Sequence, residues 1–143
     1  MFRESRIQSG HDRGAAAVEF ALLLPLLLLI IFGVIDFGRA LNAQITLTQA
    51  AREGARLDAL GQPNSAVVTR TINAATGLNL TSANVSETLV CVPNAGPTAD
   101  AQVDVSYQFS FITPVGAIAG LFGGGGFGGP ITLTAQGVMP CET

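Results

Sequence analysis

The distribution of apolar residues first separates a membrane segment from the rest of the chain. Between Gly14 and Asp36 only Glu19 is charged, and most of the other residues are Leu, Ile, Val, Ala or Phe. As a helix this stretch spans roughly 31 Å, which matches the hydrocarbon core of a bilayer. A buried helix that is apolar on all sides would need a large domain around it, which the remaining sequence is too small and too polar to supply. The pattern therefore predicts a membrane-spanning helix.

Beyond Asp36 the sequence keeps a helical spacing of three or four residues. Gly61 and Pro63 then provide a stop signal. We expect one helix from Ala15 to Leu60, of which the first half is a membrane anchor and the second half a spine for a folded domain. The residues that carry this spacing are Leu41, Ile45, Thr48, Arg52, Ala55 and Ala59.

The remaining sequence predicts a second helix and three strands. Asn64 and Ser65 are candidate N-caps for a helix over 66–76 that ends at Gly77, with an apolar stripe made by Val68, Ile72 and Ala75. Residues 84–92, 102–111 and 131–138 favour strands, the last two because apolar and polar residues alternate in them.

Such alternation is typical of a sheet with one face in water. The other face should pack on the long helix and form the core, through Val103, Val105, Tyr107, Phe109, Phe111, Ile131 and Leu133. The predicted fold is α+β: a long N-terminal membrane-spanning helix that continues as a spine and packs on a small three-stranded antiparallel sheet, broadly as in pilins.

Charge supports a division into a leader (1–14), a transmembrane helix (15–36) and an exported domain (37–143). Three of the chain's arginines precede Gly14, so the positive-inside rule places the N-terminus in the cytoplasm. The chain has no Lys, and the later arginines are scattered, so nothing suggests binding to nucleic acid. A secretory signal cut near Ala40 is the competing interpretation of the apolar segment; its site is poor and the run is longer than usual.

Cys91 and Cys141 both fall in the predicted exported domain, where disulfides persist. A bridge between them would close a loop of about 50 residues and contribute on the order of 4 kcal/mol. Two unpaired buried thiols are the alternative. No metal site is expected, because the only histidine lies in the leader.

The junction at Gly14 resembles a known processing signal. A basic head ends in Gly14, and Glu19 is the fifth residue after this glycine, at the start of the apolar helix. This pattern is similar to the type III signal of type IV pilins and pseudopilins, which a prepilin peptidase cuts after the glycine. The resemblance implies a cut between Gly14 and Ala15, and pairing of Glu19 with the new N-terminus of a neighbouring subunit during assembly. The alternative for Glu19 is a side chain that reaches the membrane surface without further function.

A wider set of motifs resembles the TadE-like family, whose members are pseudopilins or minor pilins of the tight-adherence (Flp) pilus system. The similarity rests on Arg-Gly-Ala-Ala-Ala-Val-Glu-Phe-Ala at 13–21, Pro25 among leucines, Gly-Val-Ile-Asp-Phe-Gly at 33–38 and Ala-Ala-Arg-Glu-Gly-Ala-Arg at 50–56.

Within these motifs Asp36, Arg52, Glu53 and Arg56 form a candidate docking surface, although a solvated helix face explains them equally simply. Gly54 costs about 1 kcal/mol relative to Ala inside a helix, which suggests that another element packs closely there.

The segment between the last two predicted strands is apolar and rich in glycine, particularly over 120–129. It is expected to be a mobile loop or an apolar tip carrying Leu121, Phe122 and Phe127, and its role is left open. No catalytic motif or cofactor site is expected in the chain, and therefore no enzymatic activity.

The resemblance thus implies a membrane-anchored pseudopilin or minor pilin that takes part in assembly of an adhesive Flp pilus. Its expected partners are the lipid bilayer, a prepilin peptidase, and other pilin subunits and assembly proteins. Its expected place is the cytoplasmic membrane, with the C-terminal domain exported and possible incorporation into the pilus. The alternative is an unprocessed single-span protein whose exported domain is a binding module.

Overall fold

The computed structural model describes residues 11–92, 96, 98–114, 116, 120 and 129–142. Its elements are two helices, a short 3-10 helix and three strands, which confirms the α+β fold. Their bounds are α1 His11–Ala59, α2 Asn64–Ala74, η1 Ser82–Asn84, β1 Val85–Leu89, β2 Asp100–Phe109 and β3 Ile131–Pro140.

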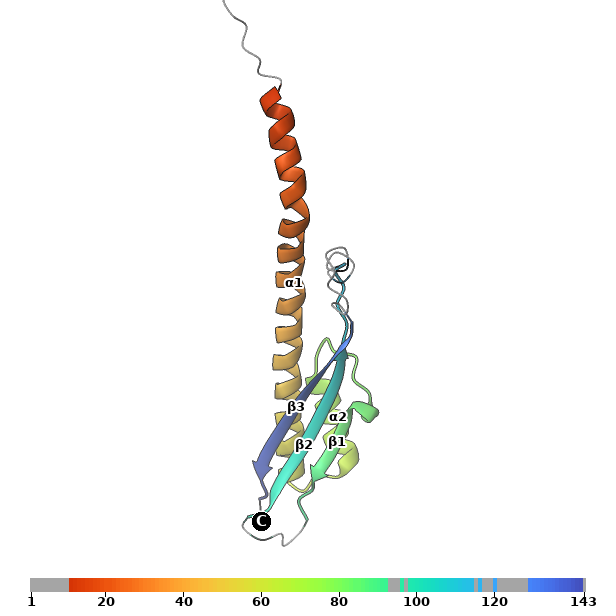
Figure 1. Cartoon of the computed structure of the whole chain (residues 1–143). Helices are drawn as coiled ribbons and strands as arrows, with labels where there is room; N and C mark the ends of the chain where they lie inside the picture. Colours follow the sequence, from red (N-terminus) through yellow and green to blue (C-terminus); the bar gives the residue numbers. More distant parts are fainter. Residues whose placement is uncertain are drawn as a thin grey trace, which may run out of the picture.

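Helix α1 is a long rod whose N-terminal half projects away from the sheet, while its C-terminal half packs against it (Figure 1). It begins at His11, earlier than the Ala15 expected from the sequence. It ends at Ala59, one residue before the predicted Leu60, and the predicted stop Gly61 follows with a φ of 68°. The N–H of Gly61 donates to the carbonyl of Asp58 at 2.8 Å, and the N–H of Gln62 donates to Leu57 at 3.1 Å, so the last turn is capped by backbone groups.

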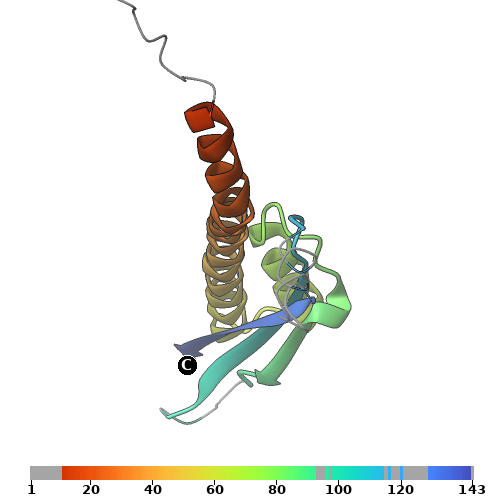
Figure 2. The same ribbon diagram turned by 45° about the horizontal axis from the view of Figure 1, so that its top comes forward.

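Helix α2 lies beside the C-terminal half of α1 (Figure 2). Its N-cap is Pro63, which contributes no side-chain hydrogen bond, so the prediction that Asn64 and Ser65 form the cap was wrong. Instead the carbonyl of Pro63 accepts the N–H groups of Ala66 and Val67, at 2.8 and 3.2 Å. The buried residues of α2 are Val67 and Thr71, next to the predicted Val68 and Ile72, which are only partly buried.

The three strands form an antiparallel sheet in the order β1-β2-β3. Val105 pairs with Val85 of β1 and Ala135 of β3, and the ladder between β2 and β3 runs without interruption from Phe109–Ile131 to Asp100–Pro140. Strand β1 is shorter, and its register shifts between Glu87 and Leu89. One face of the sheet packs on α1 and α2, and the other faces outward (Figures 1 and 2).

Most of the core residues predicted on the strands are confirmed. Val103, Val105 and Phe109 are buried, and Tyr107 and Leu133 pack half-buried against the core. Phe111 is half-buried, whereas Ile131 is 40% exposed, so its assignment to the core was wrong. Ile131 begins β3, at the end of the sheet nearest the free half of α1 (Figure 1).

The buried face of α1 is made mainly of alanines, with Leu47 as the one large side chain. Leu41 and Ile45, which carried the helical spacing in the sequence, are 49% and 58% exposed. The buried apolar positions are Ala43, Leu47, Ala50, Ala51, Ala55 and Ala59. Small side chains here let the sheet approach the helix closely.

Two glycines show how close that approach is. A Cβ on Gly137 of β3 would overlap the backbone carbonyl of Ala51 and lie 2.7 Å from the backbone N of Arg52. A Cβ on Gly54 would overlap the Thr71 hydroxyl and lie 3.2 Å from Val103 Cγ1. The expectation that another element packs against Gly54 is confirmed.

Cys91, just beyond β1, is bonded to Cys141, just beyond β3, and their Cα atoms are 5.7 Å apart. The disulfide predicted from the sequence is therefore confirmed. It joins the two outer strands at the end of the domain that is farthest from the free half of α1. The predicted apolar tip with Leu121, Phe122 and Phe127, and most of 120–129, lie outside the described residues.

Candidate functional site: helix α1 and its junction with the sheet

The N-terminal half of α1 contains a segment long and apolar enough to cross a membrane, and none of that segment is buried. Val18, Phe20, Leu22, Val34 and Phe37 are each about 60% exposed or more. Apolar surface on this scale requires a non-aqueous environment or a partner. The segment is therefore not a core helix of the described domain, and it suggests a single-pass membrane protein.

The residues of the predicted processing signal all lie on this exposed part of α1. Gly14 and Ala15 are helical, and a Cβ on Gly14 would meet nothing within 4 Å. Glu19 is one helical turn after Ala15, is exposed, and makes no hydrogen bond or ion pair with the residues that the structure describes. Its carboxylate is therefore accessible to another molecule.

Asp36 lies where α1 leaves the apolar segment, and its side chain is buried. It accepts hydrogen bonds from the backbone N–H groups of Ile112 and Thr113, both at 3.3 Å, and from the Thr113 hydroxyl. Arg39, one turn later, donates to the same carboxylate at 3.2 Å. Asp36 thus ties the chain just after β2 to the helix. These contacts do not test the predicted role of Asp36 in docking. In this conformation its carboxylate forms hydrogen bonds within the domain.

The same junction contains an apolar hollow of about 540 Å³ between α1 and the sheet. Arg39, which is bonded to Asp36 in the lining, has its guanidinium carbon 5.2 Å from the centre of the Phe109 ring, a favourable cation-π geometry. The residues that line the hollow are Gly33, Asp36, Phe37, Ala40, Leu41, Gln44, Phe111, Ile131 and Leu133.

The charged residues of the second family motif lie on an accessible face of α1. Glu53 accepts from Arg70 of α2 at 3.2 Å and lies 3.6 Å from Arg56. All three side chains are at least one-third exposed, so these pairs are worth at most about 1 kcal/mol each. Arg52 is exposed beside them. The arrangement permits docking but does not require it.

Asp58 is a buried carboxylate that the sequence reasoning missed. One of its oxygens accepts the backbone N–H of Cys91 at 3.3 Å, and the other has no hydrogen-bond partner among the described residues. Burial raises the pKa of Asp58, and the Cys91 N–H partly opposes this rise. The only sequence feature that could have indicated burial of Asp58 is its position on the alanine-rich face of α1, eight residues after Ala50.

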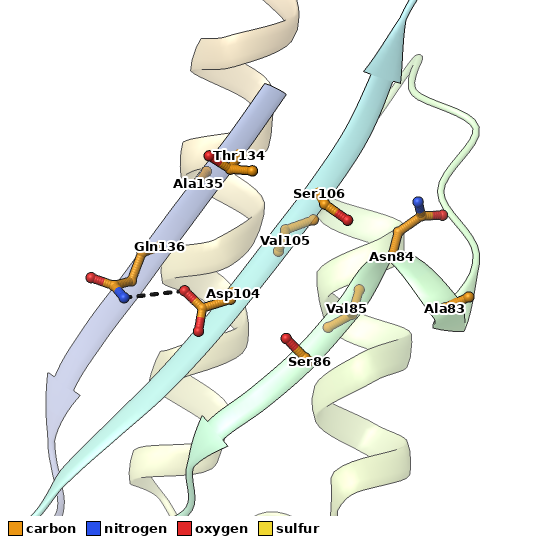
Figure 3. A pocket seen from close by; sticks show the side chains of 10 residues that line it. All are labelled: Ala83, Asn84, Val85, Ser86, Asp104, Val105, Ser106, Thr134, Ala135 and Gln136. Carbon is orange, nitrogen blue, oxygen red and sulfur yellow. Dashed lines mark hydrogen bonds between the residues drawn. The ribbon is translucent and has the colours of Figure 1, made fainter. Parts of the chain in front are cut away.

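The outer face of the sheet carries a shallow polar hollow of about 430 Å³ (Figure 3). Its one charged residue, Asp104, accepts from Thr88, from Gln102 at 2.9 Å and from Gln136 at 3.1 Å. These bonds, led by the Thr88 hydroxyl, lower the pKa of Asp104. A carboxylate so fully engaged and so readily ionised is poorly suited to act as a general base.

The described residues contain no group of three His, Cys, Asp or Glu side chains that would hold a metal ion. What the geometry offers is a long helix whose exposed apolar half carries one accessible carboxylate, Glu19, and whose other half packs on a small disulfide-bonded domain.

Comparison with known proteins adds a family match over the helix. Residues 14–56 match the model of a family described as TadE-like protein. No curated protein and no solved structure matches the chain. The resemblance inferred from the sequence motifs is confirmed over α1, which includes both the exposed apolar half and the half that packs on the sheet.

Proposed function

Since the TadE-like match covers the helix and its charged motifs, we propose that this chain is a non-catalytic minor pilin, or pseudopilin, of the tight-adherence (Flp) pilus system. It is inserted in the cytoplasmic membrane with its N-terminus inside and its domain exported. A prepilin peptidase cuts it after Gly14, and the mature protein takes part in assembly of an adhesive pilus. The observation that carries this proposal is the family match over an α1 that is half exposed and apolar.

The proposed cut is compatible with the structure around Gly14. This glycine has open space on every side and lowers the local stability of the helix by about 1 kcal/mol relative to Ala. Gly14 and Ala15 are both exposed, so this part of α1 opens at little cost when the peptidase binds. After the cut, Ala15 carries a positive amine.

Glu19 is the residue that would use this amine. It lies one turn from Ala15 on the same face of α1, and its carboxylate has no partner in the described part of the chain. In a bilayer or a helix bundle, where the effective dielectric is low, a carboxylate and an amine from neighbouring subunits attract strongly. This pairing would set the axial position of one subunit against the next.

The test is the N-terminal sequence and mass of the membrane-bound protein, expressed with and without a prepilin peptidase. We expect a start at Ala15 only when the peptidase is present, and no cut in Gly14→Leu. Gly10→Leu, which changes the leader away from the junction, is the matched control and should be cut normally. An intact Met1 in the presence of active peptidase would refute processing and leave an anchored binding module.

Assembly is tested separately. Glu19→Gln keeps the size of the side chain but removes its charge, so it should abolish pilus formation while cleavage and membrane anchoring remain normal. Normal pilus formation by Glu19→Gln would show that the charge has no part in assembly.

A further inference from the structure

Strand β3 is an edge of the sheet, and its outer side has no neighbouring strand within the described residues. The N–H of Cys141 donates to the carbonyl of Ala99 at 2.9 Å, which extends the β2–β3 ladder by one pair. Since residues of an antiparallel strand alternate in direction, the odd-numbered residues of β3 bond to β2 and the even-numbered ones point outward. The outward backbone groups belong to Thr132, Thr134, Gln136 and Val138.

One contact confirms this direction. The side-chain amide of Gln44 on α1 donates to the backbone carbonyl of Thr134 at 2.8 Å. Pro140, which has no N–H to offer, also occupies an outward position, where no ladder bond is lost.

The edge of β3 lacks the features that usually protect an exposed strand. It is ten residues long, carries no charged residue, and has no proline before its last position. The opposite edge, β1, has five residues, an irregular register and an acidic Glu87. Short, bulged and charged edges resist pairing with other chains, whereas long uncharged ones favour it.

Beneath the outer side of β3, α1 exposes apolar side chains that the sheet does not cover. Leu41 and Ile45 are the large exposed ones, at 49% and 58%. Two hollows follow this seam: the apolar one described above, and one of about 240 Å³ lined by Gln44, Ile45, Thr48, Gln49 and Arg52. The smaller hollow is lined by α1 alone. Gln44 lines both hollows and is bonded to β3, so the two adjoin at the point where α1 meets the strand's edge.

We propose that this seam, the outer edge of β3 with Leu41, Ile45 and Arg52 of α1, binds an extended strand from a partner subunit. A strand added at about 4.8 Å from β3 would satisfy the outward backbone groups and place alternate side chains over Leu41 and Ile45. We therefore expect the side chains of the added strand that face Leu41 and Ile45 to be apolar. Arg52, which is exposed and forms no ion pair with the described residues, selects a carboxylate toward the Pro140 end of β3.

A single strand fits the seam better than a second folded copy that pairs its β1 with β3. If a second copy paired its β1 with β3, its α2 would have to lie against α1. Three strands advance the sheet by about 14 Å, whereas two packed helices occupy roughly 16 to 20 Å. The helix layers of adjoining copies would collide, so a segment without a packed helix behind it is the better occupant.

The test uses the full, unprocessed chain in detergent micelles, so it does not depend on cleavage at Gly14 or on Glu19. The probe is a fluorescein-labelled peptide with the sequence of β2, residues 100–109, which already pairs with β3 from the other side and has apolar side chains at alternate positions. Binding is followed by fluorescence anisotropy, and backbone amide exchange identifies the amides that become protected.

We expect saturable binding, with the amides of Thr132, Thr134, Gln136 and Val138 gaining protection. Thr134→Pro removes one outward N–H and places a ring at the edge, so it should weaken binding by about tenfold or more. Thr134→Val, the matched control, keeps the backbone group and should bind within about twofold of the unchanged chain. Ile45→Asp should also weaken binding, and a peptide with alternate backbone nitrogens methylated should not bind.

Circular dichroism and an intact Cys91–Cys141 bond will establish that Thr134→Pro is folded. Equal binding to Thr134→Pro and Thr134→Val would overturn the proposal, as would absence of binding at peptide concentrations up to about 1 mM. Self-association of the chain that Thr134→Pro abolishes would instead identify a second copy as the occupant and refute the partner strand.

Discussion

The close contact between β3 and α1 can be tested by adding one methyl group. Gly137→Ala places a Cβ against the backbone carbonyl of Ala51 and 2.7 Å from the backbone N of Arg52. Backbone atoms cannot rotate away as a side chain can, so β3 must move outward by roughly 1 Å to restore a normal contact. Overpacking of this kind typically costs 1 to 3 kcal/mol. Because the shift disturbs the β2–β3 ladder as well, we expect a loss of about 3 kcal/mol in the free energy of unfolding.

Two further glycines of the same chain give a graded series. Gly54→Ala also creates an overlap, but its nearest atom is the hydroxyl of Thr71, and its next contact is Val103 Cγ1 at 3.2 Å. Because side chains can partly adjust, the expected loss is about 1 to 2 kcal/mol. At Gly38 a Cβ meets nothing within 4 Å, so Gly38→Ala should be neutral or stabilise the helix by up to about 1 kcal/mol.

The assay is urea unfolding of the full chain in detergent, followed by tyrosine fluorescence. The chain has one tyrosine and no tryptophan, and Tyr107 pairs with Leu133 of β3, so its signal reports on the strand that must move. The expected order of stability is Gly38→Ala, then Gly54→Ala, then Gly137→Ala. If Gly137→Ala were as stable as Gly38→Ala, the close backbone approach of β3 to α1 would be refuted.

Three other variants probe the ends of the domain. Burial raises the pKa of Asp58 in the folded protein, so above about pH 4 the folded state holds a proton that the unfolded state has lost. The free energy of unfolding should therefore fall as pH rises from about 4 through the folded pKa, with a slope of at most about 1.4 kcal/mol per pH unit. Urea unfolding at several pH values measures this slope, and Asp58→Asn should remove it. Asp36→Ala should lower the exchange protection of the Thr113 amide by about tenfold, measured by hydrogen exchange, because that N–H loses its acceptor; unchanged protection would contradict the tie between α1 and the segment after β2. Replacing Cys91 and Cys141 together by Ser should cost about 4 kcal/mol in urea unfolding, and a cost near zero would mean that the bridge constrains the unfolded chain little.

The disulfide was predicted from the location of both cysteines in the expected exported domain. The sequence was also sufficient to predict the kinds of element and their order. These depend on short-range patterns: the uninterrupted apolar run before Asp36, the alternation in β2 and β3, and the stop at Gly61. The cap of α2 was mispredicted because Asn64 and Ser65 are common N-cap residues, whereas the chain uses the carbonyl of Pro63. Residue preferences for the N-cap position cannot identify the cap when the backbone geometry of the preceding residue decides where the helix begins.

The contacts of Asp36 and Asp58 could not be predicted for a different reason. Asp36 bonds to Thr113, 77 residues away, and Asp58 bonds to Cys91, 33 residues away. Nothing in the neighbourhood of either aspartate indicates that distant backbone N–H groups will reach it. Only the register of the sheet on α1 determines these pairs, and that register is set by packing of side chains across the whole domain.

That packing also explains why hydrophobicity did not identify the buried face of α1. Leu41 and Ile45 are among the most apolar residues of its second half and are exposed, whereas the face that packs on the sheet is, apart from Leu47, rich in alanine and includes Gly54. Contact between two backbones requires small side chains at the interface. The face of α1 that packs on the sheet is therefore determined by the size of its side chains and not by their hydrophobicity. Leu41 and Ile45 are then left in water, next to a strand edge that carries no charge. Exposed apolar side chains and an uncharged strand edge are each unfavourable in an isolated domain. Here Leu41 and Ile45 adjoin the edge of β3, and binding of another chain over the side chains and the edge would account for both features.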